Sequence, residues 1–158
     1  MNATDEYWSN LQKTLSRRTL YIDTGAILGY LEKDNDKFHD FFDKSTGYRF
    51  ITSTYVITET VRRLVKSQTP NQFVGPNGER LRDLSLFVLN NWIEEMNIQV
   101  IHLPVEVFEE AKQHYCSKAY IPCDLTDVIS YWIVSHLGQD RIVAADKHFY
   151  TLGLNLEP

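Results

Sequence analysis

Two short apolar runs each end in an aspartate, and from such a position a carboxylate could hold a cation. Asp23 ends the run TLYI, and Asp146 ends the run RIVAA. Short apolar runs of this kind are typical of buried strands. In an open parallel sheet, ligands bind just outside the carboxyl ends of the strands. Two aspartates at strand ends therefore indicate one functional site.

Two further acids fall on predicted helices. Glu59 lies beside the apolar positions of a helix predicted over 55–66, and Asp127 lies in the first turn of a helix that begins at Asp124. An ionised carboxylate near a core boundary is costly unless it is paired or bound to a cation. Several carboxylates in one cleft repel each other, and Mg²⁺ or Mn²⁺ relieves that repulsion through oxygen ligation. The four acids together predict a site for Mg²⁺ or Mn²⁺.

Each acid also has a simpler structural interpretation. Asp23 could cap the helix that follows its strand. Glu59 could pair with Arg62 or Arg63 at the next turn of its helix, a common surface arrangement. Such interpretations explain one acid at a time, whereas a cation site explains all of them.

The segment DLTD has the spacing of a capping box, with one acid at the N-cap and another three residues later. We interpret Asp124 as the cap and Asp127 as a metal ligand. Asp146 could be a plain turn residue at the end of its strand.

Three basic residues share the helix of Glu59. Arg62, Arg63 and Lys66 could hold RNA phosphates beside the acids, because charge-assisted contacts position a backbone without reading its sequence. A solvated helix face explains the same residues equally well.

The cysteines and the nearest histidine carry a weaker signal. Cys116 and Cys123 are too few for a disulfide framework, and no Cys-x-x-Cys or neighbouring histidine pattern suggests zinc. We interpret both as reduced structural thiols. His148 lies two residues from Asp146, but a lone histidine in a loop is more often incidental.

The order of predicted elements sets the fold. Short strands alternate with amphipathic helices, and the strands are predicted over 19–23, 49–52, 98–103 and 141–145. This alternation favours a three-layer α/β/α sandwich with a mainly parallel central sheet, connected by right-handed crossovers. Residues 1–18 are predicted as an N-terminal helical extension, and residues 19–158 as a single domain. Residues 67–80, with two prolines and two glycines, are predicted as a loop and a candidate lid.

Composition narrows the class of protein. The 158 residues, 43% of them hydrophobic, suit one compact domain. A net charge of -5 argues against a broad phosphate-binding surface, so nucleic-acid contact should be local or bridged by metal. Neither a signal peptide nor an apolar run of membrane-spanning length is present. We therefore expect a cytoplasmic protein without a membrane partner.

Four segments, in order, resemble the motifs of the PIN domains, a large family of metal-dependent ribonucleases that includes the VapC-like toxins of toxin–antitoxin pairs. LYIDTGAILGYL resembles the opening strand and turn, STYVITETVRRL the helix with the glutamate, CDLTDVISYWIV the third motif and IVAADKHFYTLGL the last. The resemblance covers about residues 19–156. It implies an α/β/α sandwich on which Asp23, Glu59, Asp127 and Asp146 form an acidic quartet.

Three departures from the family pattern are present. Many members have threonine or serine two residues before the last aspartate, whereas this chain has Ala144, which lacks a hydroxyl that could orient a ligand. Many have serine or threonine three residues before the third aspartate, where Asp124 could add a fifth carboxylate. The family's first strand usually starts almost at the initiator methionine, whereas here an extension of about eighteen residues precedes it.

The leading hypothesis is a ribonuclease that depends on Mg²⁺ or Mn²⁺, an endoribonuclease that is either a VapC-like toxin or a solitary nuclease. Asp23, Glu59 and Asp127 would hold the first ion, and Asp146 would complete the site or help to hold a second. The resemblance also implies an RNA substrate, a homodimer and, for a toxin, an antitoxin partner.

Two other classes of function are alternatives. A non-catalytic PIN-like module that binds RNA or protein is favoured slightly by Ala144 and the N-terminal extension, but binding alone would not keep four carboxylates together at an electrostatic cost. A phosphatase of the haloacid dehalogenase type would need a second aspartate two residues after the first, and that position is Gly25.

Overall fold

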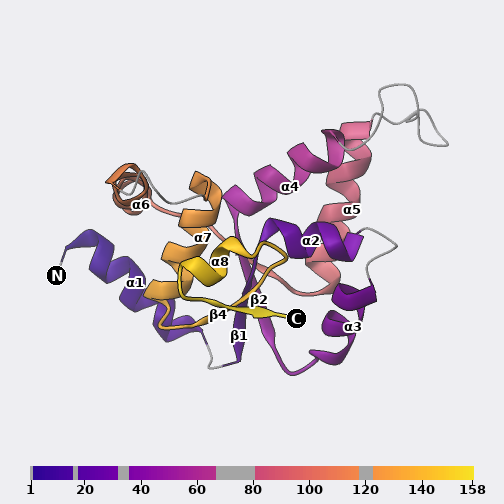
Figure 1. Cartoon of the computed structure of the whole chain (residues 1–158), viewed down its shortest axis with the longest axis horizontal. Helices are drawn as coiled ribbons and strands as arrows, with labels where there is room; N and C mark the ends of the chain where they lie inside the picture. The colour runs from indigo at the N-terminus through magenta and orange to yellow at the C-terminus, as the bar shows by residue number, and fades with distance from the viewer. Residues whose placement is uncertain (1, 16–17, 32–35, 67–80, 118–122) are drawn as a thin grey trace.

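The computed structural model describes residues 2–15, 18–31, 36–66, 81–117 and 123–158, with only the backbone described for residues 81–85 (Figure 1). Residues 67–80, which are predicted as a loop and a candidate lid, lie outside the described residues.

A parallel sheet of five strands, in the order β3-β2-β1-β4-β5, forms the centre of the described part of the chain. The strands are β1 (Thr19–Ile22), β2 (Arg49–Ser53), β3 (Gln99–Ile101), β4 (Arg141–Val143) and β5 (Asn155–Glu157). Every pairing is parallel, so the predicted sheet type is confirmed. The edge strand β5 was not predicted, because three residues with one apolar side chain give no periodic signal.

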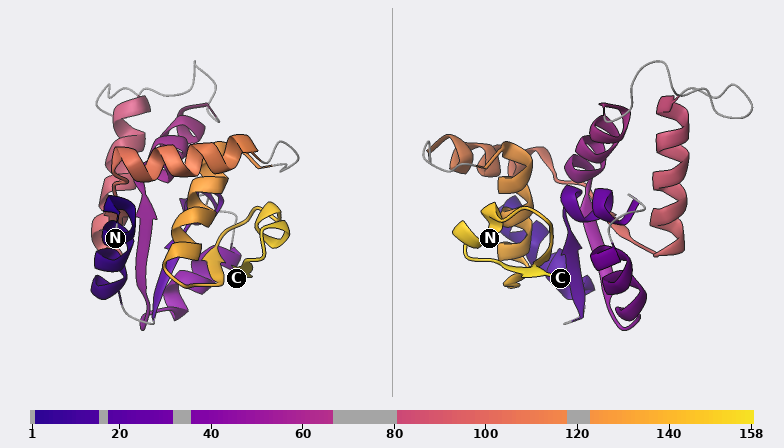
Figure 2. Two further views of the ribbon diagram at one scale, coloured as in Figure 1. Left: turned by 90° about the vertical axis from the view of Figure 1, so that its left-hand side faces the viewer. Right: turned by 45° about the vertical axis from the view of Figure 1, so that its right-hand side comes forward.

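Helices cover both faces of the sheet, so the predicted α/β/α layering is confirmed (Figures 1 and 2). The helices are α1 (Ala3–Thr14), α2 (Thr24–Leu31), α3 (Asp36–Lys44), α4 (Thr54–Lys66), α5 (Leu81–Glu95), α6 (Val105–Ser117), α7 (Leu125–His136) and α8 (His148–Thr151). Helices α2 to α5 lie on one side, and α1, α6 and α7 on the other. No described helix combines the length and the apolar character that a membrane crossing needs.

The core is continuous on both faces of the sheet because parallel strands are buried on both sides. All four residues of β1 are buried, and Ile51, Ile142 and Val143 of the neighbouring strands are fully or almost fully shielded from solvent. The apolar stripe of α7 buries Ile129 and Ile133 against them.

The N-terminal helix α1 packs on the body of the molecule. Trp8 is buried and stacks on His136 of α7 with ring centroids 4.6 Å apart. The Thr4 hydroxyl donates a hydrogen bond of 2.9 Å to Glu110 of α6. The predicted extension is therefore a helix that adds an aromatic side chain to the core.

The order of the strands reverses between β1 and β4. The chain leaves β1 into α2 on one face, but reaches β4 from α7 on the other face. The carboxyl ends of the two strands stay joined, since the Asp23 amide donates a hydrogen bond of 2.9 Å to the Val143 carbonyl. A Cβ at Gly25 would lie 3.0 Å from the Cβ of Ala145, so this close approach favours glycine. A reversal of this kind is where open α/β sheets bind ligands.

Candidate metal centre

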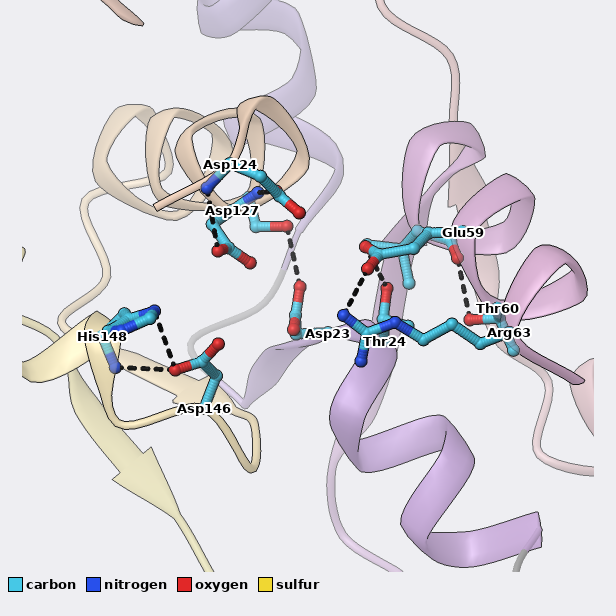
Figure 3. Close-up of polar contacts among 11 residues, drawn as sticks. Asp23, Thr24, Glu59, Thr60, Arg63, Asp124, Asp127, Asp146 and His148 are labelled. Atoms are coloured by element: carbon cyan, nitrogen blue, oxygen red, sulfur yellow. Dashed lines mark hydrogen bonds and ion pairs between the residues drawn. The ribbon is translucent and has the colours of Figure 1, made fainter. Parts of the chain in front are cut away.

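A pocket of about 230 Å³ opens at the carboxyl ends of β1 and β4. Its lining comprises Asp23, Thr24, Gly25, Glu59, Arg63, Asp127, Ala145 and Asp146. The structure thus brings all four predicted acids, from four separate elements, to one place (Figure 3). A larger pocket of about 380 Å³ lies at the amino ends of the same strands, but its lining offers one carboxylate, Asp140.

Asp23 is the most deeply buried of the four acids, with 3% of its surface exposed. It directly follows β1, and its carboxylate accepts a hydrogen bond of 3.1 Å from the Ser130 hydroxyl of α7. Burial raises the pKa of Asp23 to about 7, with additional increases from Asp127 and Glu59 that outweigh the stabilising bond from Ser130.

Asp127 is held in the first turn of α7 by a capping box. The Asp127 amide donates a hydrogen bond of 2.9 Å to the Asp124 carboxylate. The Asp124 amide donates one of 3.3 Å to the Asp127 carboxylate. Burial, and then the charge of Asp124, raises the pKa of Asp127 to about 6. The interpretation of Asp124 as the N-cap is confirmed, but Asp124 is exposed and lies outside the pocket lining.

Glu59 lies on α4 across the pocket from Asp127 (Figure 3). One of its oxygens is 2.7 Å from the Arg63 guanidinium, and the other accepts a hydrogen bond of 3.0 Å from the Thr24 hydroxyl. The simpler interpretation, a pair with an arginine one turn along, therefore holds for Arg63, but the paired glutamate still lines the pocket. Arg62 and Lys66 are exposed and are not part of that lining.

Asp146 is the most accessible of the four carboxylates, with 41% of its side chain exposed. Its Oδ1 accepts a hydrogen bond of 2.9 Å from the backbone amide of His148, and the Nδ1 of His148 lies 3.2 Å from the same oxygen. Ala144, two residues earlier, is buried at the end of β4 and is not part of the pocket lining.

The charges of the pocket favour a cation. The raised pKa values of Asp23 and Asp127 show that each ionised carboxylate is destabilised by burial and by its acidic neighbours. A divalent cation would remove that cost. Carboxylate oxygens are the donors that Mg²⁺ and Mn²⁺ prefer, so the residues present fit such an ion.

Two hydroxyl residues that support the acids were not singled out from the sequence. Ser130 follows Asp127 by three positions, which places both on one side of α7. A serine inside the apolar segment DVISYWIV was the available signal. Thr24 had no such signal, because a threonine after a strand-end aspartate is common at the start of a helix.

Comparisons with known proteins agree with the fold. A family model described as PIN domain matches residues 20–154. The solved structure of VapC20 from Mycobacterium tuberculosis, a Sarcin-Ricin loop cleaving toxin, is similar with a TM-score of 0.65 and 17% identity, over 88% of this chain and 99% of that one. No curated protein gives a significant match.

Two further structures show the same fold at 12% identity over 88% of this chain. VapBC2 from Rickettsia felis, bound to a DNA fragment from its promoter, has a TM-score of 0.62 over 97% of that chain. FitAcB from Neisseria gonorrhoeae has a TM-score of 0.59 over 96% of that chain. With a family model that spans most of its length and VapC toxins among its structural neighbours, this chain belongs to the PIN-domain family.

Proposed function

We propose that this protein is a ribonuclease that hydrolyses RNA phosphodiester bonds with Mg²⁺ or Mn²⁺ held by Asp23, Glu59, Asp127 and Asp146. The observation that carries the proposal is the convergence of these carboxylates, from four elements, on one pocket at the strand reversal. When bound, the ion would lower the pKa of water and neutralise charge that develops on the phosphodiester.

The protein's own residues position the donors. Ser130 fixes the carboxylate of Asp23, and the capping box fixes Asp127. Thr24 and Arg63 fix Glu59 from two sides. These contacts orient the ligands before an ion arrives, which lowers the ordering cost of binding.

Asp146 differs from the other three because it is more exposed and adjoins a histidine. This accessibility suits a ligand that completes the coordination sphere or helps to hold a second ion. The exposed Arg62 and Lys66 lie on the helix of Glu59 and would contact phosphates further along the strand.

The structural neighbours support further proposals about the reaction and the partners of this protein. VapC20 is a Sarcin-Ricin loop cleaving toxin, and this similarity supports the proposed endonucleolytic cut in RNA. VapBC2 and FitAcB are toxin–antitoxin complexes, which supports an antitoxin partner. We further propose a homodimer that acts in the cytoplasm.

One observation favours a second candidate, a PIN-like module that binds RNA or protein without cutting. Ala144 supplies no hydroxyl at the end of β4. The raised pKa values of Asp23 and Asp127 count against this candidate, because a pure scaffold gains nothing from destabilised carboxylates.

Cleavage of defined RNAs with Mn²⁺ tests the proposal. The wild type should cut, Asp23→Asn should abolish cutting while its circular dichroism spectrum stays unchanged, and excess EDTA should stop the wild type. Asp43→Asn, at an exposed acid of α3, is the matched control and should cut normally. Unchanged cutting by Asp23→Asn, or full activity in EDTA, would refute the proposal.

A further inference from the structure

A second group of donor atoms lies beside the acidic pocket. One ligand atom each from Cys123, Asp127 and His148 lies within 4.8 Å of the other two. Cys123 directly precedes the α7 cap, and His148 opens α8. Neither Cys123 nor His148 belongs to the pocket lining, so this group shares only Asp127 with the four acids.

The donors differ in kind from those of the acidic pocket. Thiolate and imidazole are the preferred ligands of Zn²⁺ and similar thiophilic ions, whereas Mg²⁺ takes oxygen. Three protein ligands with a fourth position open to solvent form a common zinc arrangement. We propose that Cys123, Asp127 and His148 form a binding site for a thiophilic divalent cation of the Zn²⁺ class, adjacent to the acidic pocket.

The distances between the three donor atoms need to shorten only slightly to suit tetrahedral coordination. Tetrahedral ligation at about 2.3 Å to sulfur and about 2.0 Å to nitrogen places donor atoms roughly 3.5 Å apart. The three donors lie at most 4.8 Å apart, and the half-exposed His148 ring can close the difference.

The buried thiol of Cys123 also supports the proposed cation site. Cys123 is 5% exposed, and it forms no disulfide within the described part of the chain. The carboxylates of Asp127, Asp146 and Asp124 lie near enough to act electrostatically on this sulfur. The same negative charges attract a cation, which would replace the thiol proton and release it to solvent.

The imidazole is already oriented. Asp146 contacts His148 through the ring Nδ1 at 3.2 Å and through the backbone amide at 2.9 Å (Figure 3). A carboxylate beside the imidazole is a usual support of a metal-binding histidine, because it fixes the orientation of the ring.

Cobalt binding to the reduced 158-residue chain tests this site. Co²⁺ bound by a thiolate gives a near-ultraviolet charge-transfer band, so Co²⁺ alone, with a phosphine reductant, is the probe. The wild type should show the band and Cys123→Ser should lose it. The matched control is Cys116→Ser, because Cys116 is the exposed cysteine of α6, and this variant should keep the band.

Two further measurements keep the test decisive if Cys123→Ser folds poorly. His148→Gln, at a half-exposed position, should weaken Co²⁺ binding by about tenfold or more. Zn²⁺ should remove the Co²⁺ band at a lower concentration than Mg²⁺. A wild type without a band, a band lost in Cys116→Ser but kept in Cys123→Ser, or equal displacement by Mg²⁺ and Zn²⁺ would overturn the inference.

The test is separable from the ribonuclease proposal. Asp23→Asn removes a carboxylate of the acidic pocket but none of the three donors, so it should keep the Co²⁺ band even though it loses cleavage. Loss of the band in Asp23→Asn would mean that Co²⁺ binds to the acidic pocket, and would overturn the inference.

Discussion

At the residue scale, the feature with the widest consequences is the buried Asp23 carboxylate. Its pKa of about 7 and that of Asp127, about 6, both lie above the ordinary value of 3.8. The folded, metal-free protein therefore binds more protons than the unfolded chain between about pH 4 and pH 7. By linkage, the stability from these two groups is complete below about pH 4 and is lost as the pH rises through their folded-state values.

The metal-free protein should accordingly lose thermal stability as the pH rises from 4 to 7. Thermal unfolding in EDTA, followed by circular dichroism across this range, measures the effect. Asp23→Asn should flatten the profile and unfold at a higher temperature than the wild type at pH 7, because the amide cannot ionise. Parallel profiles for the two proteins would show that Asp23 keeps an ordinary pKa.

The two neighbouring arginines of α4 offer a matched pair. Arg63 contacts Glu59 at 2.7 Å, whereas Arg62 is exposed and lies outside the pocket. An exposed ion pair contributes under about 1 kcal/mol, so Arg63→Ala should lower the rate of RNA cleavage at saturating Mn²⁺ by roughly two- to fivefold. Arg62→Ala should weaken RNA binding without changing the maximal rate. Equal effects of the two substitutions on the maximal rate would contradict the positioning role of Arg63.

The sequence predicted the four acids because each has a local signal, a strand end or a helix position beside an apolar stripe. Their meeting in one pocket depends on the order of the strands, which spacing along the chain does not specify. The group around Cys123 and His148 had no local signal, because these two residues are far apart in the sequence and approach only in the folded chain.

At the element scale, α1 is an integral part of the packing. Trp8 is 4% exposed and stacks on His136, whose ring also lies 4.7 Å from that of Trp132. The helix begins with a capping box formed by Asn2 and Asp5. The cap fixes where the helix starts, and the aromatic contacts fix where it lies.

Trp8→Ala should lower the free energy of unfolding by about 3–5 kcal/mol, the usual cost of removing a large buried aromatic side chain. Urea unfolding measures the change. Phe87→Ala, at a side chain of α5 that is 62% exposed, is the control and should stay within about 0.5 kcal/mol of the wild type. A small effect of Trp8→Ala would mean that α1 is detached in solution.

Helical periodicity predicted the long helices well, since an apolar stripe such as that of α7 repeats over several turns. It could not predict the four-residue α8 or the three-residue β5. The strand β5 forms because β4 supplies a parallel neighbour for it, a contact that no local pattern encodes. The packing of α1 against α6 and α7 also depends on tertiary contacts, which the sequence pattern of α1 does not specify.

At the scale of the whole molecule, a net charge of -5 opposes RNA binding. The four carboxylates increase that repulsion at the pocket, where the substrate must approach. A bound divalent cation would offset part of this negative charge at the place where a phosphate must approach. Function and stability should therefore depend on the same ion.

Mg²⁺ should raise the thermal midpoint of the wild type, because an ion that binds only the folded state stabilises it by about 2.7 kcal/mol at a hundred times its dissociation constant. The increase should be larger at pH 8 than at pH 5, since protonated Asp23 and Asp127 cannot ligate the ion. Differential scanning fluorimetry measures it. Asp23→Asn should show little increase, and an increase equal to that of the wild type would place the ion elsewhere.

Calorimetric titration with Mn²⁺ at neutral pH tests the central claim, that the four carboxylates form one cation site, most directly. The wild type and Asp43→Asn should bind Mn²⁺ with the same affinity, and Asp23→Asn should show no saturable binding in the same range. Equal Mn²⁺ affinity of the wild type and Asp23→Asn would contradict the claim.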